Sequence, residues 1–294
     1  MTVATPRRVL VTGAAGLIGR AVVELLHSRG VPATALVLDD PGDLPVDRVV
    51  IGNAGDSDLV RGALRDVDAV AHLAAVPSPH GMPAIDVFAG NSRATFAVLE
   101  EAGRAGVPRM MIASSYSVLG LPWSPRRLHP DYYPIDERTP LQVEDPYGLS
   151  KQADEATATM ISRRYGATVV AVRFPFVGDD RRLAERLTRT VADPGSAAMD
   201  SWAYLHVRDA AEVTWRALTE PLTGFQAPFV AAPKILAPYA TEALIAAYHP
   251  HTPLRRRLPG REVPIDLRTG QRLLRFTAQH LVELDTIALP AKTS

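Results

Sequence analysis

The sequence predicts an α/β fold: a doubly wound parallel sheet followed by a smaller C-terminal α+β lobe. Short apolar runs alternate with helical patterns through the first 174 residues, and a glycine-rich turn joins the first run to the first helix. Continuous apolar runs are typical of strands that are buried on both faces of a parallel sheet. The chain has 294 residues, of which 47% are hydrophobic. This is enough for one large α/β unit or two coupled lobes.

The first strand, turn and helix form the most informative stretch. Val9–Val11 is an apolar run, and Gly13, Gly16 and Gly19 follow it at three-residue spacing. From Leu17 onward apolar residues recur at helical spacing. A helix that opens directly from a strand presents free amides and the positive end of its dipole, which favours phosphate binding. A glycine turn that binds nothing is the alternative, and the flanking strand and helix disfavour it.

The second strand is predicted at residues 33–38 and ends beside Asp39. In a dinucleotide site an acid at this position hydrogen-bonds the adenosine ribose. The alternative is that Asp39 serves only the turn before Pro41, a role that suits aspartate equally well. A third strand at 49–51 and a short helix at 58–64 follow.

The fourth strand is predicted at residues 69–73, and it ends in Ala74-Ala75. Small residues there allow a ligand to lie across the carboxyl edge of the sheet, where open α/β sheets bind their ligands. His72 lies inside the apolar run, so we expect it to be structural rather than catalytic. The next loop carries Ser78 and His80 at the same edge, and we expect both to face substrate.

Polar residues follow the fifth strand. A helical pattern at 88–105 contains Asn91, and the strand at 110–113 runs into Ser114–Ser117. Hydroxyl groups at the carboxyl end of this strand lie beside the expected cofactor position.

Tyr147 and Lys151 are four residues apart, so on a helix they share one face. A nearby ammonium favours the ionised form of a phenol. A tyrosine with an ordinary pKa of about 10 needs about three units of lowering, or about 4 kcal/mol, to act as a base at neutral pH. The same spacing is common on helix surfaces without function, but here it follows a dinucleotide turn and a serine-bearing strand.

The second half of the chain supplies the remaining elements. We expect strands at 169–174, 204–207 and 226–231 and helices at 179–192 and 209–218, and the segments 241–248, 254–257 and 267–274 complete the small lobe. Residues 1–174 plus 204–232 are therefore assigned to the dinucleotide-binding domain, and residues 175–203 plus 233–294 to the substrate lobe. The basic run Arg255–Arg257 is either a solvated face or a grip for a substrate phosphate or carboxylate.

Composition excludes several classes of function. Basic and acidic residues number 32 each, and this balance favours neither nucleic acid nor an anionic membrane as partner. The chain has no cysteine, which excludes disulfides, thiolate metal sites and cysteine nucleophiles. No motif predicts a bound metal. The N-terminal residues are too few and too polar for a signal peptide, and no apolar run reaches spanning length, so we expect a cytoplasmic protein.

Taken in order, these motifs resemble the extended short-chain dehydrogenases/reductases, also called the NAD-dependent epimerase/dehydratase family. The matching segments run through nearly the whole chain: Thr12-Gly13-x-x-Gly16-x-x-Gly19, His72-Leu73-Ala74-Ala75, Asn91, Ser115, Tyr147-x-x-x-Lys151, His206–Ala211, Ile265-Asp266 and Leu273–Phe276. The resemblance implies a Rossmann-type cofactor domain and a homodimer formed through the helices near 88–105 and 147–164.

The resemblance also implies roles for single residues. Tyr147 would be the general acid/base, Lys151 would favour its ionised form and hold the nicotinamide ribose, Ser115 would hydrogen-bond the reacting oxygen, and Asn91 would support the site through water. The cofactor would contact Gly13, Gly16, Leu17, Ile18, Gly19, Asp39, Asn53, Ala54, Leu73, Ala74, Ala75, Tyr147, Lys151, Phe174, Pro175 and Phe176. The substrate would contact Ser78, His80, Ser115, Ser117, Trp202 and Arg256.

Departures from the family pattern bear on the cofactor. Counted without gaps from Gly30, the usual ribose-binding acid position is Val37, and the acid comes two residues later as Asp39. NADP-preferring relatives often carry arginine at the position of Leu38, so no cation is expected for a 2′-phosphate. We therefore predict NAD over NADP. Asn53 stands where an aspartate near adenine is usual.

The chain looks nearest to the uronate dehydrogenase-like members of the family. Tyr116 and Ser117 stand where dehydratases carry acids, which disfavours dehydration, and Ala197 stands near the arginine that uronate enzymes use for the carboxylate. We predict hydride transfer to or from an alcohol or carbonyl of a sugar-like polar small molecule. Two alternatives remain: an epimerase of sugars or nucleotide sugars with tightly bound NAD, and a dinucleotide-binding sensor without catalysis.

Overall fold

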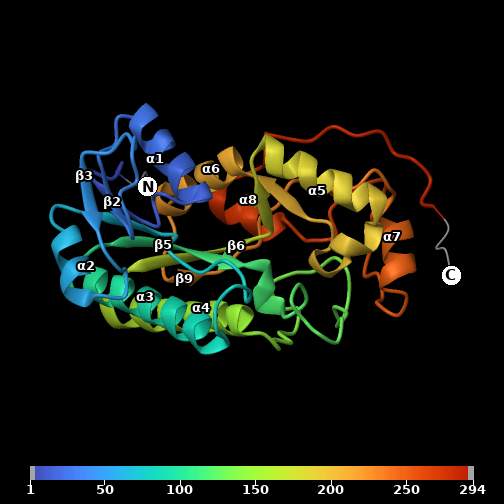
Figure 1. Ribbon diagram of the computed structural model, residues 1–294, viewed down its shortest axis with the longest axis horizontal. Helices are drawn as coiled ribbons and strands as arrows, with labels where there is room; N and C mark the ends of the chain where they lie inside the picture. Colours follow the sequence, from blue (N-terminus) through green and yellow to red (C-terminus); the bar gives the residue numbers. More distant parts are fainter. Residues whose placement is uncertain (1–3, 291–294) are drawn as a thin grey trace.

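A computed structural model describes residues 4–290 and shows a central parallel sheet of seven strands in the order β3-β2-β1-β4-β5-β6-β9 (Figure 1). Every neighbouring pair is parallel, as the alternation of apolar runs and helices predicts. The strands are β1 (Val9–Thr12), β2 (Ala33–Val37), β3 (Arg48–Ile51), β4 (Ala69–His72), β5 (Arg109–Ser115), β6 (Thr168–Phe174) and β9 (Phe225–Gln226).

Helices cover both faces of this sheet. Figure 1 shows α1 (Leu17–Ser28) and α6 (Val207–Thr219) on one face, and α2 (Ser57–Ala63), α3 (Ala84–Arg104) and α4 (Pro146–Tyr165) on the other. Side chains along β1 alternate between the two layers: Val9 and Val11 pack in one core cluster and Leu10 in the other. The fully buried apolar strands therefore confirm the doubly wound α/β fold.

A smaller lobe lies at the end of the molecule opposite β3 (Figure 1). It contains the two-stranded sheet of β7 (Phe176–Gly178) and β8 (Tyr204–His206) together with α5 (Asp180–Ala192), η2 (Pro194–Asp200) and α7 (Thr241–Tyr248). A core cluster that includes Tyr133, Trp202 and Phe229 fills this lobe. The segment η1 (Tyr116–Leu119) and α8 (Arg268–Leu274) connect it to the sheet.

Some elements differ from the predictions in extent. The helix predicted from residue 88 begins at Ala84 because Pro83 precedes it, and proline suits a helix start. The predicted return strand at 226–231 is reduced to β9 and a single bridge between Arg173 and Phe229. Pro228 interrupts it because proline has no N–H to donate. Residues 254–257 form neither helix nor strand, and β8 pairs with β7 rather than joining the large sheet.

The strand order places a switch point between β1 and β4. The chain leaves β1 toward β2 on one side, while β4 lies on the other side. Open α/β sheets bind ligands in the crevice at the carboxyl ends of such strands. The glycine turn and Leu73–Ala75 both follow strands that meet here. Within residues 4–290, none of the helices has the length and hydrophobicity needed to span a bilayer.

Candidate active site

The glycine turn leaves space for close backbone contacts. Gly13 has φ of +67°, and a Cβ there would lie 2.7 Å from the backbone nitrogen of Ala74. A Cβ on Gly19 would overlap the carbonyl oxygen of Gly13. Helix α1 begins after Gly16 with no side-chain cap. The turn therefore has the shape, and the first turn of α1 the polarity, of a pyrophosphate site.

The first turn of α4, which carries Tyr147, packs against η1 at the end of β5. Asp145 caps this helix by accepting the amide of Gly148 at 2.8 Å. A Cβ on Gly148 would lie 2.7 Å from the carbonyl oxygen of Ser117, so the helix backbone and η1 are in contact. Ser115 ends β5, and its Oγ accepts the amide of Ser117 at 3.0 Å. The side chains of Ser115 and Tyr147 belong to adjoining elements and are both more than nine-tenths buried.

Lys151 lies one turn further along α4, with its Nζ 5.8 Å from the centroid of the Tyr147 ring. The same Nζ lies 3.1 Å from Oδ2 of Asp154. Burial disfavours the charged form of Lys151, but Asp154 and Tyr147 outweigh it and raise the lysine pKa above its ordinary value. The site therefore holds a buried ammonium beside the phenol, as the Tyr-x-x-x-Lys spacing predicts.

Asn91 fastens the loop after β4 to α4. Its Nδ2 donates to the carbonyl of Val76 at 3.1 Å and to Oγ of Ser150 at 3.0 Å, and its Oδ1 accepts the amide of Val76 at 2.8 Å. These direct contacts hold the loop after β4 against α4, whereas the sequence predicts a role for Asn91 through water.

His72 is structural, as expected. Its Nδ1 lies 2.7 Å from Oγ1 of Thr12 and its Nε2 lies 3.1 Å from Oγ1 of Thr95. Burial, with a smaller contribution from Lys151, lowers the His72 pKa to about 3. No group of three or more histidine and carboxylate side chains within residues 4–290 is placed to hold a metal ion.

The end of β2 carries both an acid and a cation. Asp39 is exposed and makes no hydrogen bond or ion pair within the described part of the chain. Arg20 of α1 donates to the carbonyls of Ala15 at 3.1 Å and Pro41 at 2.8 Å. Arg20 thus brings a cation to this turn that the position of Leu38 does not indicate, but its guanidinium is engaged by these two carbonyls. Asn53 follows β3 and is exposed.

The loop after β4 carries the predicted polar side chains of Ser78 and His80. Ser78 and His80 form a turn in which Oγ of Ser78 accepts the amide of His80 at 3.3 Å. The His80 ring contacts Trp123 edge-on, with ring centroids 5.2 Å apart. Trp123 belongs to the loop after η1, so two loops meet here. Ser117 is buried.

Two predicted substrate contacts are not supported. The indole of Trp202 is only 1% exposed and donates to the carbonyl of Pro194 at 2.7 Å, so it packs in the lobe core. Arg256 forms an ion pair with Glu262 at 2.7 Å. The neighbouring basic residues also have partners. Arg255 lies over the ring of Tyr132 in a cation–π contact, and Arg257 forms an ion pair with Glu242. The basic run is therefore used within the lobe.

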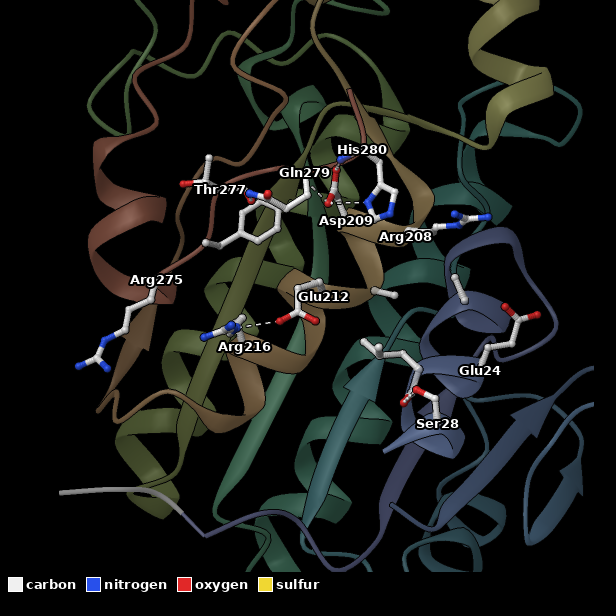
Figure 2. A pocket seen from close by; sticks show the side chains of 14 residues that line it. Glu24, Ser28, Arg208, Asp209, Glu212, Arg216, Arg275, Thr277, Gln279 and His280 are labelled. Carbon is white, nitrogen blue, oxygen red and sulfur yellow. Dashed lines mark hydrogen bonds and ion pairs between the residues drawn. The ribbon is translucent and has the colours of Figure 1, made fainter. Parts of the chain in front are cut away.

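A cavity of 680 Å³ lies on the other face of the sheet, between α1, α6 and residues 275–280 (Figure 2). Asp209 of α6 accepts the amides of Gln279 and His280 and lies 3.0 Å from Nδ1 of His280. Glu212 and Arg216 pair at 2.8 Å on its wall. The lining of this cavity includes none of the predicted site residues.

Comparison with known proteins agrees with this arrangement. The model of the NAD dependent epimerase/dehydratase family matches residues 9–230, more than half of the chain. The chain belongs to this family. The epimerase/dehydratase match includes the glycine turn, Ser115, Tyr147 and Lys151, the residues around which the site is built.

Three relatives illustrate the family. A UDP-glucose 4-epimerase of Azospirillum brasilense is 33% identical over 187 residues, which are 59% of this chain and 49% of the relative. A uronate dehydrogenase of Pseudomonas putida is 31% identical over 178 residues, 59% of this chain and 62% of the relative. The match thus spans about half to three fifths of these relatives. A short-chain dehydrogenase/reductase superfamily protein of Agrobacterium tumefaciens, solved with bound NAD, aligns over 93% of both chains with 25% identity and a TM-score of 0.69.

Two charged residues near the candidate site, Asp154 and Arg20, were not predicted from the sequence. Asp154 is three residues after Lys151 on the same helix, a spacing that signals a possible ion pair. Arg20 directly follows the last turn glycine, and its reach to Pro41 depends on the path of the chain after β2.

Proposed function

We propose that the protein is an NAD-dependent oxidoreductase that acts on an alcohol or carbonyl group of a sugar-like polar small molecule. The observation that carries this proposal is the buried pair of Tyr147 and Lys151 on α4, a helix whose first turn contacts η1 directly after Ser115. The close approach of Gly13 to Ala74 and the uncapped start of α1 fit a dinucleotide. When bound, the nicotinamide ring would supply the acceptor or donor of hydride.

The roles of the chain's own residues follow from their chemistry. In the oxidation direction, Tyr147 in its ionised form takes the proton of the substrate hydroxyl, and in reduction it returns that proton to the carbonyl oxygen. Lys151 stabilises the ionised tyrosine because its ammonium is held close in a buried site. Ser115 donates its hydroxyl proton to the reacting oxygen, which its burial and its place at the end of β5 support.

The substrate class rests on the relatives and on the loops. The relatives include an epimerase of UDP-glucose and a dehydrogenase of uronate. Ser78, His80 and Ser117 supply hydroxyl and imidazole groups for a polyhydroxy substrate. Ala197, which stands near the arginine of uronate enzymes, is buried and carries no charge. We therefore propose a neutral sugar-like substrate rather than a uronate.

Epimerisation with tightly held NAD is the second candidate, and the 33% identity to a UDP-glucose 4-epimerase favours it. The basic run Arg255–Arg257 would have to bind the diphosphate of a nucleotide sugar. Its side chains already have partners within the lobe, which disfavours epimerisation. The purified protein decides between them. A dehydrogenase binds added NAD and forms NADH with an alcohol substrate, whereas an epimerase copurifies with NAD and shows no net absorbance change during turnover.

We further propose NAD rather than NADP, because exposed Asp39 would repel a 2′-phosphate. The single guanidinium of Arg20 is already held by two carbonyls. We also propose a homodimer that pairs α3 and α4 of two copies. Ile85, Phe96 and Leu149 are large apolar side chains of these helices and are 67%, 48% and 46% exposed.

A further inference from the structure

We propose that Asp154 is a positioning residue for Lys151: its carboxylate keeps the buried ammonium charged and fixes it next to Tyr147. This inference rests on the proposed function only where catalysis is concerned. The geometry that carries it is an ion pair of 3.1 Å between two side chains that are 5% and 1% exposed. A salt bridge this deeply buried is screened little by water.

A chain of hydrogen bonds leads from Thr12 of β1 through His72 toward the carboxylate of Asp154. Oγ1 of Thr12, at the end of β1, accepts the amides of Leu73 and Ala74, both at 3.3 Å. Its own proton is therefore free to point at Nδ1 of His72, 2.7 Å away. A neutral imidazole that accepts at Nδ1 carries its proton at Nε2. His72 then donates from Nε2 to Oγ1 of Thr95 at 3.1 Å.

Asp154 lies near the far end of this chain, where the Thr95 hydroxyl acts to lower its pKa. Because Thr95 accepts from His72, its hydroxyl proton remains available for a second acceptor. Oδ1 of Asp154 is buried and has no hydrogen-bond partner among the described residues, whereas Oδ2 holds Lys151. Burial raises the pKa of Asp154, while Lys151 and the Thr95 hydroxyl act in the opposite direction. The carboxylate is thus paired with the Lys151 ammonium through Oδ2, and the nearby Thr95 hydroxyl also favours its charged form.

The other charged groups around the pair are balanced. Glu155, the next residue of α4, accepts hydrogen bonds from Nε and Nη2 of Arg173 of β6 at 2.9 and 2.8 Å. His72 of β4 is neutral because burial lowers its pKa to about 3. Thr95 is the polar group that α3 contributes, and Tyr147 is the remaining titratable neighbour on α4. Asp154 is therefore the carboxylate that matches Lys151.

This pairing has two consequences for catalysis. A buried ammonium without a partner loses its proton more easily, so Asp154 keeps Lys151 charged at alkaline pH. The negative charge of Asp154 also offsets part of the effect of Lys151 on the ionisation of Tyr147. Replacing Asp154 by asparagine therefore lowers the pKa values of both Tyr147 and Lys151. The acid limb of the pH profile of oxidation, set by Tyr147, and the alkaline limb, set by Lys151, both shift toward lower pH.

The direct test is a titration of Lys151 by NMR, since the chain has only three lysines, Lys151, Lys234 and Lys292. The full-length protein is labelled with [ε-¹³C]lysine, and Lys151→Arg assigns the signal. In the wild-type protein the expected midpoint is above about 10.4, the ordinary value for lysine. In Asp154→Asn the midpoint falls by about one pH unit or more. Asp209→Asn removes a carboxylate of similar burial from α6 and leaves Lys151 unchanged.

A wild-type midpoint below about 10.4 overturns the inference, and so does an unchanged midpoint in Asp154→Asn. If Asp154→Asn does not fold, the wild-type midpoint alone decides. These readouts need no substrate, so they stand even if no turnover is found and the proposed function fails. Where a substrate is found, the pH profile of kcat/KM provides the second readout. A shift of both limbs to lower pH supports the role of Asp154, and an unchanged profile contradicts it.

Discussion

Gly13→Ala tests the fit of the glycine turn with a matched control. Gly13 and Gly30 have nearly the same φ, +67° and +66°, but a Cβ on Gly30 meets nothing within 4 Å. A Cβ on Gly13 would lie 2.7, 2.8 and 2.9 Å from three backbone atoms of Leu73 and Ala74. The left-handed backbone costs about 1–2 kcal/mol in either variant. The forced contacts add about 1–3 kcal/mol in Gly13→Ala alone.

Urea unfolding of both variants measures this difference, and we expect Gly13→Ala to be less stable than Gly30→Ala by about 1–3 kcal/mol. Titration with NAD supplies the functional readout. Movement of Ala74 away from the turn alters the crevice between β1 and β4, so affinity falls by about tenfold or more in Gly13→Ala, or about 1.4 kcal/mol. Equal stability and equal NAD affinity in the two variants would refute the claim that close packing at Gly13 builds the cofactor site.

Three other predictions address the cofactor, the core and the oligomer. Asp39→Asn removes the charge that would repel a 2′-phosphate, so the ratio of NAD to NADP affinity falls by about tenfold; a ratio unchanged from the wild type excludes this role. The pKa of buried His72 is lowered to about 3, so protonation of the unfolded chain below about pH 6.5 favours unfolding. Stability therefore falls between pH 6.5 and pH 4.5 by up to about 3 kcal/mol, and His72→Gln flattens this dependence in unfolding measured against pH. Phe96→Glu places a charge on the proposed α3–α4 interface and gives a monomer by light scattering, whereas a wild type that is already monomeric removes the proposal.

Most of the doubly wound sheet could be predicted because its signals are local. One continuous stretch predicts a strand, a turn and a helix, through the apolar run Val9–Val11 and the glycines at 13, 16 and 19. The Tyr147–Lys151 spacing fixes a shared helix face without knowledge of the rest of the chain. The return strand was predicted to be longer than it is. Pro228 lacks an N–H and interrupts the strand, although this proline was visible in the sequence.

Contacts within the smaller lobe could not be predicted because their partners lie far apart in the sequence. Trp202 stands near residues that resemble a substrate site, but its burial depends on packing with η2 and α7. Arg256 and Arg257 find Glu262 and Glu242 only after the lobe has folded. Asp154 lies between these cases, since its spacing from Lys151 is visible in the sequence and its burial is not.

The central claim is that Tyr147 exchanges the proton while hydride passes between substrate and nicotinamide. The most direct measurement is NADH formation by wild-type protein and Tyr147→Phe with a substrate found in a panel of neutral sugars and polyols. We expect Tyr147→Phe to lower kcat by at least about a hundredfold. NAD still binds and Tm stays unchanged, because phenylalanine keeps the buried ring. Near wild-type turnover in Tyr147→Phe would contradict the account.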